Sequence, residues 1–135
     1  MRFRKQAPAI AVVEDDEAVQ NSINGLLKSA GYRCEAYRSV EVFLDVCGLQ
    51  DFDCVIVDFR LPGVNGLDLQ VHLRDAGYKT PIIMISACED RVRNRSFELG
   101  AVAVPGKPFD GETLLAAIRS ALEASGSKMG SRKPR

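Results

Sequence analysis

The chain has 135 residues, of which 46% are hydrophobic and 27% are charged, and its formal net charge is zero. This length and composition fit one compact domain with its own core. No apolar run is long enough to cross a membrane, and the N-terminal segment lacks the pattern of a secretion signal. The four cysteines lack the spacing of a zinc site, and a chain of this size does not need disulfides to fold. We therefore expect a cytoplasmic protein with reduced thiols and no membrane partner.

Basic residues are concentrated at the two ends of the chain, since 7 of the 18 lie within residues 1–8 or 125–135. The part between them, residues 9–124, holds 11 basic and 18 acidic residues, which gives a net charge of −7. An acidic body argues against direct binding of nucleic acid. We expect residues 1–8 to be a flexible N-terminus, residues 9–124 to form the folded domain, and residues 125–135 to be a flexible basic tail.

Short apolar runs alternate with segments of helical period along the folded part. The predicted strands are residues 9–13, 33–37, 54–57, 81–85 and 101–104. The predicted helices are residues 18–30, a segment that Ser39 caps and that runs through Val46, a segment containing Leu67 and Leu73, residues 91–99, and a last helix that Asp110 caps. This alternation is typical of βα units. The sequence therefore predicts an α/β fold, with a doubly wound five-stranded parallel sheet and helices on both faces.

Polar side chains stand where the predicted strands end. Glu14 and Asp15 follow the first strand, Asp58 ends the third, Ser86 ends the fourth, and Lys107 follows the fifth. Ligands of doubly wound sheets bind at this edge. Because clustered carboxylates repel one another unless a cation neutralises them, the three acids predict a Mg²⁺ site. Asp58, at the end of a buried strand, is the candidate nucleophile toward phosphorus, and Ser86 and Lys107 are expected to hold the phosphate.

A simpler interpretation exists for the acidic run after the first strand. Acids are favoured at a helix N-terminus by the helix macrodipole. This explains Asp16 and Glu17 better than it explains Glu14 and Asp15. We expect the latter pair to lie on the strand side of the turn and to face Asp58.

Four segments of the chain resemble the receiver domain of two-component response regulators: VVEDDEAV, DCVIVDFRLPGVNGLDL, PIIMISA and GKPF. The resemblance covers residues 10–122. It implies the chemotaxis-regulator-like fold, with the flavodoxin-like strand order 2-1-3-4-5. It also implies the following site: Asp58 as phosphoacceptor, Asp15 as a direct Mg²⁺ ligand, Glu14 as its acidic neighbour, the backbone carbonyl of Arg60 as a further ligand, and Ser86 and Lys107 as contacts of the phosphoryl group.

The same resemblance implies a signalling role within a phosphorelay. The phosphate donor would be a histidine kinase or a histidine phosphotransfer protein, and the output would be a contact with a downstream protein target. A homodimer would use the face formed by the fourth helix, the fifth strand and the fifth helix. The domain would not be an enzyme beyond catalysing its own phosphorylation and dephosphorylation, and we expect no output domain within these residues.

One position departs from the family pattern. Val104 stands where the family usually has an aromatic residue whose rotation accompanies activation, so we expect movement of Ser86 to couple to a backbone shift at Pro105 and Gly106 instead. The departure keeps open a second interpretation, a receiver-like interaction module that does not depend on phosphate. A phosphatase of the aspartyl-nucleophile kind would need an acid two residues after the nucleophile, where Arg60 stands.

The predicted fourth helix is unusually basic for an acidic body, because it carries Arg91, Arg93 and Arg95. The simplest interpretation is a solvated charged face, and the alternative is a contact surface for output. Cys88 lies two residues after Ser86, and a small buried residue explains it as well as a redox role does.

Overall fold

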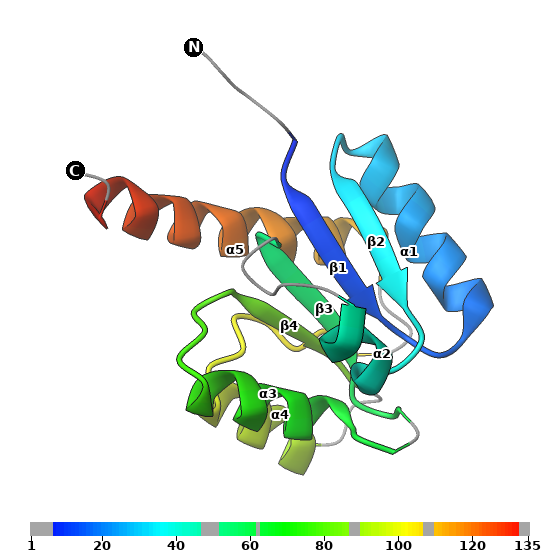
Figure 1. The fold of residues 1–135 in the computed structure, drawn as a ribbon. Helices are drawn as coiled ribbons and strands as arrows, with labels where there is room; N and C mark the ends of the chain where they lie inside the picture. Colours follow the sequence, from blue (N-terminus) through cyan, green and yellow to red (C-terminus); the bar gives the residue numbers. More distant parts are fainter. Residues whose placement is uncertain (1–6, 47–51, 62, 87–89, 107–109, 133–135) are drawn as a thin grey trace.

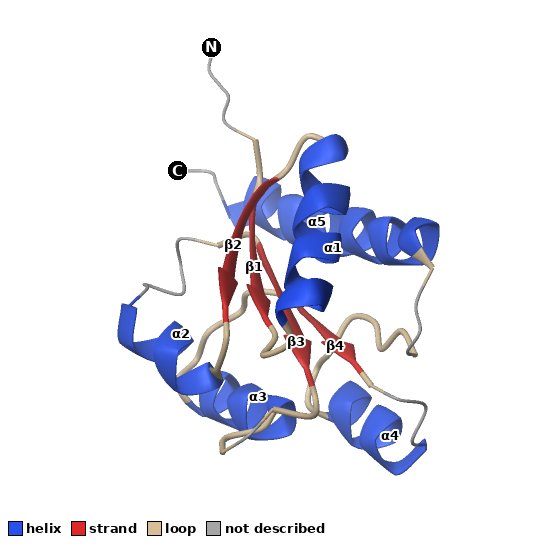
Figure 2. Ribbon diagram, turned by 90° about the vertical axis from the view of Figure 1, so that its right-hand side faces the viewer, coloured by secondary structure: helices blue, strands red, loops and turns tan. Residues whose placement is uncertain are grey.

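The computed structural model describes residues 7–46, 52–61, 63–86, 90–106 and 110–132. A sheet forms the centre of the molecule, and helices cover both of its faces (Figures 1 and 2). The strands are β1 (Ala9–Val13), β2 (Arg33–Tyr37), β3 (Cys54–Asp58) and β4 (Ile82–Ile85). The helices are α1 (Glu17–Ser29), α2 (Val40–Val46), α3 (Gly66–Asp75), α4 (Asp90–Glu98) and α5 (Gly111–Arg132). Within the described residues, no helix has the length and apolar character needed to cross a membrane.

The four strands are parallel and lie in the order β2-β1-β3-β4. β1, β3 and β4 are buried along their whole length, whereas β2 is partly exposed. Buried parallel strands are built from continuous apolar runs, which is the pattern that predicted them. The chain leaves β1 to form β2 on one side and then β3 on the other. The strand order therefore reverses beside β1 and β3, and this is where doubly wound folds bind ligands.

Alternate residues of each strand pack on opposite faces of the sheet, because side chains alternate along a strand. On one face, Ile10 and Val12 belong to a core cluster with residues of α1 and α5. On the other face, Ala11 and Val13 belong to a cluster with Phe43 of α2 and residues of α3. The predicted arrangement of helices on both faces is confirmed.

Several helix ends follow signals that the sequence carries. The side chain of Asp16 accepts hydrogen bonds from the N–H groups of Ala18 and Val19 at the start of α1. The hydroxyl of Ser39 accepts one from the N–H of Val42 at 3.0 Å, as its predicted capping role requires. Gly31 follows α1 with a φ of 90°, a conformation that glycine adopts without strain.

The predicted fifth strand, residues 101–104, is not a regular strand. Ala103 forms an isolated parallel bridge with Ile83, and Gly106 forms another with Ser86. The segment thus lies beside β4, but it does not pair continuously. Pro105 cannot donate a ladder hydrogen bond, and a glycine weakens a strand interior, so Pro105 and Gly106 account for the interruption. The order 2-1-3-4 is confirmed, and the prediction of a fifth continuous strand was wrong.

Helix α5 extends further than the sequence predicted. It continues to Arg132, beyond the predicted end of the folded domain at residue 124, and the flexibility expected of residues 125–135 stays a prediction. Extension of an existing helix adds one hydrogen bond for each residue that is fixed, which lets a segment of modest helix propensity follow a packed helix. Residues 1–6 and 133–135 lie outside the described part of the chain.

A buried polar pair joins α3 to α4. The hydroxyl of Ser96 donates to Oε1 of Gln70 at 2.7 Å, and Nε2 of Gln70 donates to the carbonyl of Ser96 at 3.2 Å. Both side chains are almost fully buried. Buried polar groups are costly unless they are paired, so this mutual pairing specifies how the two helices sit against each other.

Candidate functional site

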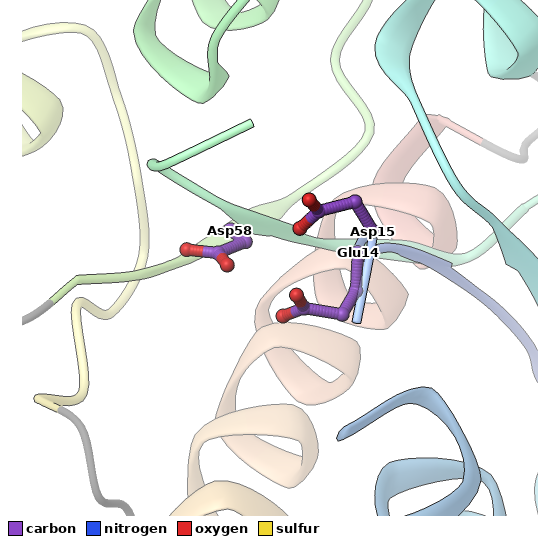
Figure 3. Close-up of side chains that lie close together, drawn as sticks. All are labelled: Glu14, Asp15 and Asp58. Carbon is purple, nitrogen blue, oxygen red and sulfur yellow. The ribbon is translucent and has the colours of Figure 1, made fainter. Parts of the chain in front are cut away.

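Three carboxylates meet at the carboxyl end of the sheet (Figure 3). Glu14 and Asp15 follow β1, Asp58 ends β3, and each offers an oxygen that lies within 4.8 Å of the others. The β1–β3 pairing explains the meeting, because Val13 is opposite Val57 and the next residue of each strand therefore lies at the same level. Glu14 is 2% exposed and Asp58 is 4% exposed, whereas Asp15 is exposed to solvent.

Backbone contacts fix the β1 side of this cluster. The N–H of Glu14 donates to the carbonyl of Tyr37 at 2.9 Å. Oε2 of Glu14 accepts from the N–H of Asp16 at 3.1 Å, and the amide of Gln20 donates to the Glu14 carbonyl. Asp16 caps helix α1, while Glu14 and Asp15 face Asp58. The structure therefore confirms that the acidic run divides between a capping role and the site.

Asp58 is also held in place on the β3 side. Its Oδ1 accepts from the N–H of Arg60 at 3.1 Å, and the N–H of the intervening Phe59 donates to the carbonyl of Ile85 at 2.9 Å. At the start of α3, a Cβ on Gly66 would lie 3.0 Å from the carbonyl oxygen of Asp58 and 2.7 Å from Sδ of Met84. Only a glycine lets α3 begin this close to the end of β3.

The donor set fits a small hard cation. All three side chains offer carboxylate oxygens, the ligands that Mg²⁺ prefers. Two of the three groups are nearly buried, and burial of like charges close together is unfavourable without a compensating cation. Glu14, Asp15 and Asp58 are therefore suitable ligands for Mg²⁺. The predicted contribution of the Arg60 carbonyl stays a prediction.

Ser86 lies next to this cluster. It follows β4 directly, and its neighbour Ile85 pairs with Asp58 across the sheet. Its side chain is 2% exposed, and its Oγ has no hydrogen-bond partner among the residues that the structure describes. A buried hydroxyl without a partner is unusual in a folded protein and fits a group that awaits a ligand oxygen. Lys107 and Cys88 lie outside the described residues, so the roles considered for them stay predictions.

Sequence reasoning missed two contacts that shape this edge of the sheet. Oε2 of Glu41, on α2, accepts from the N–H of Val64 at 3.3 Å and so ties α2 to the turn after β3. Nη1 of Arg93, on α4, donates to the carbonyl of Val104 at 3.0 Å. Each contact joins a side chain to the backbone of a distant segment, and no local pattern signals such a pairing.

Comparisons with known proteins identify one family that matches most of this chain. The family model for the response regulator receiver domain matches residues 10–119. The response regulator protein TodT of Pseudomonas putida is 38% identical over 119 residues, which are 87% of this chain and 52% of TodT. The transcriptional regulatory protein FixJ of Bradyrhizobium diazoefficiens is 34% identical over 114 residues, which are 84% of this chain and 56% of FixJ. The chain spans about half the length of these curated relatives.

Solved structures of response regulators also match this chain. The response regulator StyR superposes with a TM-score of 0.86 at 31% identity, over 94% of this chain and 65% of the StyR chain. The chemotaxis protein CheY4 of Vibrio cholerae superposes with a TM-score of 0.77 at 25% identity, over 86% of this chain and 99% of that chain. The superpositions thus cover most of this chain, and the range matched by the family model includes Glu14, Asp15 and Asp58.

Proposed function

Because this chain belongs to the response regulator receiver domain family, we propose that it is a phosphorylation-dependent switch and that Asp58 accepts the phosphoryl group. The observation that carries this proposal is the cluster of three carboxylates within 4.8 Å, with a nearly buried Asp58 held at the end of β3. Among the three acids, only Asp58 is itself a residue of a strand. Glu14 and Asp15 belong to the loop after β1.

The proposal gives each residue of the site a task. A carboxylate oxygen of Asp58 attacks phosphorus, and the new P–O bond forms as the P–N bond of a phosphohistidine donor breaks. Glu14, Asp15, Asp58 and the Arg60 carbonyl would hold Mg²⁺, which when bound offsets negative charge on the phosphoryl oxygens. The hydroxyl of Ser86 donates to one of those oxygens. Lys107 is proposed as the ammonium that pairs with the phosphoryl group.

Membership of the family implies a histidine kinase partner, with a phosphotransfer protein as the alternative donor. We propose that the domain works in the cytoplasm and passes its signal on by contact with a downstream protein, through monomers or through a homodimer on the α4, 101–106 and α5 face. The acidic body, with 11 basic and 18 acidic residues, favours protein targets over nucleic acid. Its only chemistry would be its own phosphorylation and dephosphorylation.

Mass spectrometry tests the proposal directly. The protein is incubated with acetyl phosphate and Mg²⁺, and its intact mass is compared with that of Asp58→Asn. We expect the mass of one phosphoryl group to be gained by the parent and not by the variant, because the amide is not a nucleophile toward phosphorus. Asp75→Asn, at the exposed end of α3, is the matched control and should gain the same mass as the parent. Chelation of Mg²⁺ should abolish the gain in the parent and in Asp75→Asn.

One observation favours a second candidate, an interaction module that does not depend on phosphate. Position 104 holds a valine, so it has no aromatic ring that could rotate on activation. The side chain of Val104 is 4% exposed and packs in the core. The mass experiment separates the two functions. Absence of a gain in the parent protein, with Mg²⁺ present, would support the interaction module and contradict the switch.

A further inference from the structure

Three hydrogen bonds form a continuous connection between the site and helix α4. The N–H of Ser86 donates to the carbonyl of Pro105 at 3.3 Å, and the N–H of Met84 donates to the carbonyl of Ala103 at 3.1 Å. Between these two acceptors, the carbonyl of Val104 receives Nη1 of Arg93 at 3.0 Å. The 103–105 segment is thus bound to β4 and Ser86 on one side and to α4 on the other.

The Val104 carbonyl needs a donor because the segment lies at the edge of the sheet. Its isolated bridges use Ala103 and Gly106, and no further strand of the described chain pairs beyond it. A partly buried carbonyl without a partner costs free energy, and the guanidinium of Arg93 supplies the missing N–H. Arg93 therefore donates the hydrogen bond that a backbone N–H of a neighbouring strand would donate inside the sheet.

Arg93 differs in this respect from a neighbouring arginine of the same helix. The Cζ atom of Arg93 lies 5.4 Å from the centre of the Phe97 ring, and Phe97 is 42% exposed at the surface of α4. Arg95 instead pairs with Glu98 at 3.3 Å, and both of these side chains are exposed. The basic face of α4 is thus not a uniform solvated surface, because one guanidinium links an exposed aromatic ring to the backbone beside Ser86.

We infer that Arg93 is a positioning residue that transmits the state of Ser86 to the α4 surface. The inference rests on the proposed function, because it takes a phosphoryl group on Asp58 as the event that engages the Ser86 hydroxyl. A new hydrogen bond to that hydroxyl displaces Ser86, and the Pro105 carbonyl moves with the Ser86 N–H. Val104 is adjacent to Pro105, so its carbonyl moves as well and carries Arg93 and the Phe97 ring with it.

The test compares the amide resonances of α4 before and after phosphorylation in ¹⁵N-labelled protein, with acetyl phosphate and Mg²⁺ as the probe. In the parent, phosphorylation should shift the signals of Ser86, of residues 103–106 and of α4. In Arg93→Ala, the Ser86 shift should persist and the α4 shifts should be lost. Arg91→Ala, which removes another exposed arginine of the same helix, is the matched control and should retain all of them. Arg93→Lys keeps a donor and should recover part of the α4 response.

Intact mass is measured on the same samples, so that the two proposals are tested separately. Absence of phosphorylation in the parent would overturn the proposed function, and this inference would fall with it. If the parent and Arg93→Ala are both phosphorylated and their α4 shifts are equal, the inference alone is wrong. Loss of phosphorylation in Arg93→Ala would also overturn it, because Arg93 would then act on the acceptor and not on the response of α4.

Discussion

Glu14 and Asp58 are carboxylates that the fold buries almost completely, at 2% and 4% exposure. Burial disfavours the charged form of such groups, and a second charge nearby increases the cost. Hydrogen bonds from the N–H groups of Asp16 and Arg60 offset part of it. Two apolar residues at these positions would stabilise the fold more, so the acids are better explained by a ligand than by stability.

A buried thiol gives the fold a measurable pH dependence. Burial raises the pKa of Cys54 from 9.0 to about 12, and the nearby carboxylate of Asp53 adds to the shift. In the unfolded chain the thiol loses its proton at lower pH, so this contribution to stability is present below about pH 9 and is lost as the pH rises toward 12. Over that window the free energy of unfolding should fall by about 1.4 kcal/mol per pH unit. Urea unfolding at a series of pH values measures the slope.

Cys54→Ala is the comparison for this measurement. Tyrosine and lysine titrations are common to both proteins, so the difference between the two slopes isolates the thiol. The variant should show a smaller fall of stability with pH, although its stability near pH 8 is lower because a buried sulfur atom is removed. Equal slopes in both proteins would show that Cys54 ionises alike in the folded and unfolded states.

At the scale of elements, the start of α3 depends on a residue without a side chain. A Cβ at Gly66 would contact Sδ of Met84 at 2.7 Å and the Asp58 carbonyl at 3.0 Å. We expect Gly66→Ala to destabilise the protein by about 1–2 kcal/mol, because overpacking outweighs the better helix propensity of alanine. Urea unfolding measures the change. On the proposed function, phosphorylation of Asp58 should also be slower, because the added Cβ would displace the Asp58 backbone.

Gly25→Ala is the matched control within helix α1. A Cβ at Gly25 would meet nothing within 4 Å. This substitution should therefore stabilise the protein by about 0.5–1 kcal/mol, as expected for glycine replaced in an exposed helix interior. If Gly66→Ala proves equally stabilising, the close approach of α3 to β3 is not a constraint.

The elements also show what sequence patterns can predict. Continuous apolar runs placed β1, β3 and β4, and the residues after them placed Glu14, Asp15, Asp58 and Ser86 at one edge. The extent of strand pairing near Pro105 could not be predicted from apolar runs, because it depends on which N–H groups reach β4. The contact between Arg93 and the Val104 carbonyl joins two elements, and a periodicity within one element contains no information about it.

For the whole molecule, ligand binding and stability are linked. If Mg²⁺ binds the folded cluster and not the unfolded chain, its concentration should raise the melting temperature. At about a hundred times the dissociation constant, the added stability is about 2.7 kcal/mol. Thermal unfolding followed by circular dichroism, with Mg²⁺ or with a chelator, measures the difference. Asp15→Asn should remove most of it, because one ligand oxygen loses its charge.

The adjacent Asp16 provides a control at nearly the same place. Its side chain caps α1, and asparagine caps helices equally well, so Asp16→Asn removes one charge without loss of the cap. This variant should keep most of the Mg²⁺ effect. Equal losses in Asp15→Asn and Asp16→Asn would mean that the ion responds to the general negative field and not to specific ligands.

The β1–β3 register is fixed at the opposite end of the sheet by a reciprocal pair of contacts. The N–H of Ala9 donates to Oδ2 of Asp53 at 2.8 Å, and the N–H of Asp53 donates to the carbonyl of Ala9 at 2.8 Å. Segments more than forty positions apart must thus align before the acids can converge. If Asp58 accepts a phosphoryl group as proposed, an incompletely synthesised or misfolded chain would offer no competent acceptor, because its acids would not converge.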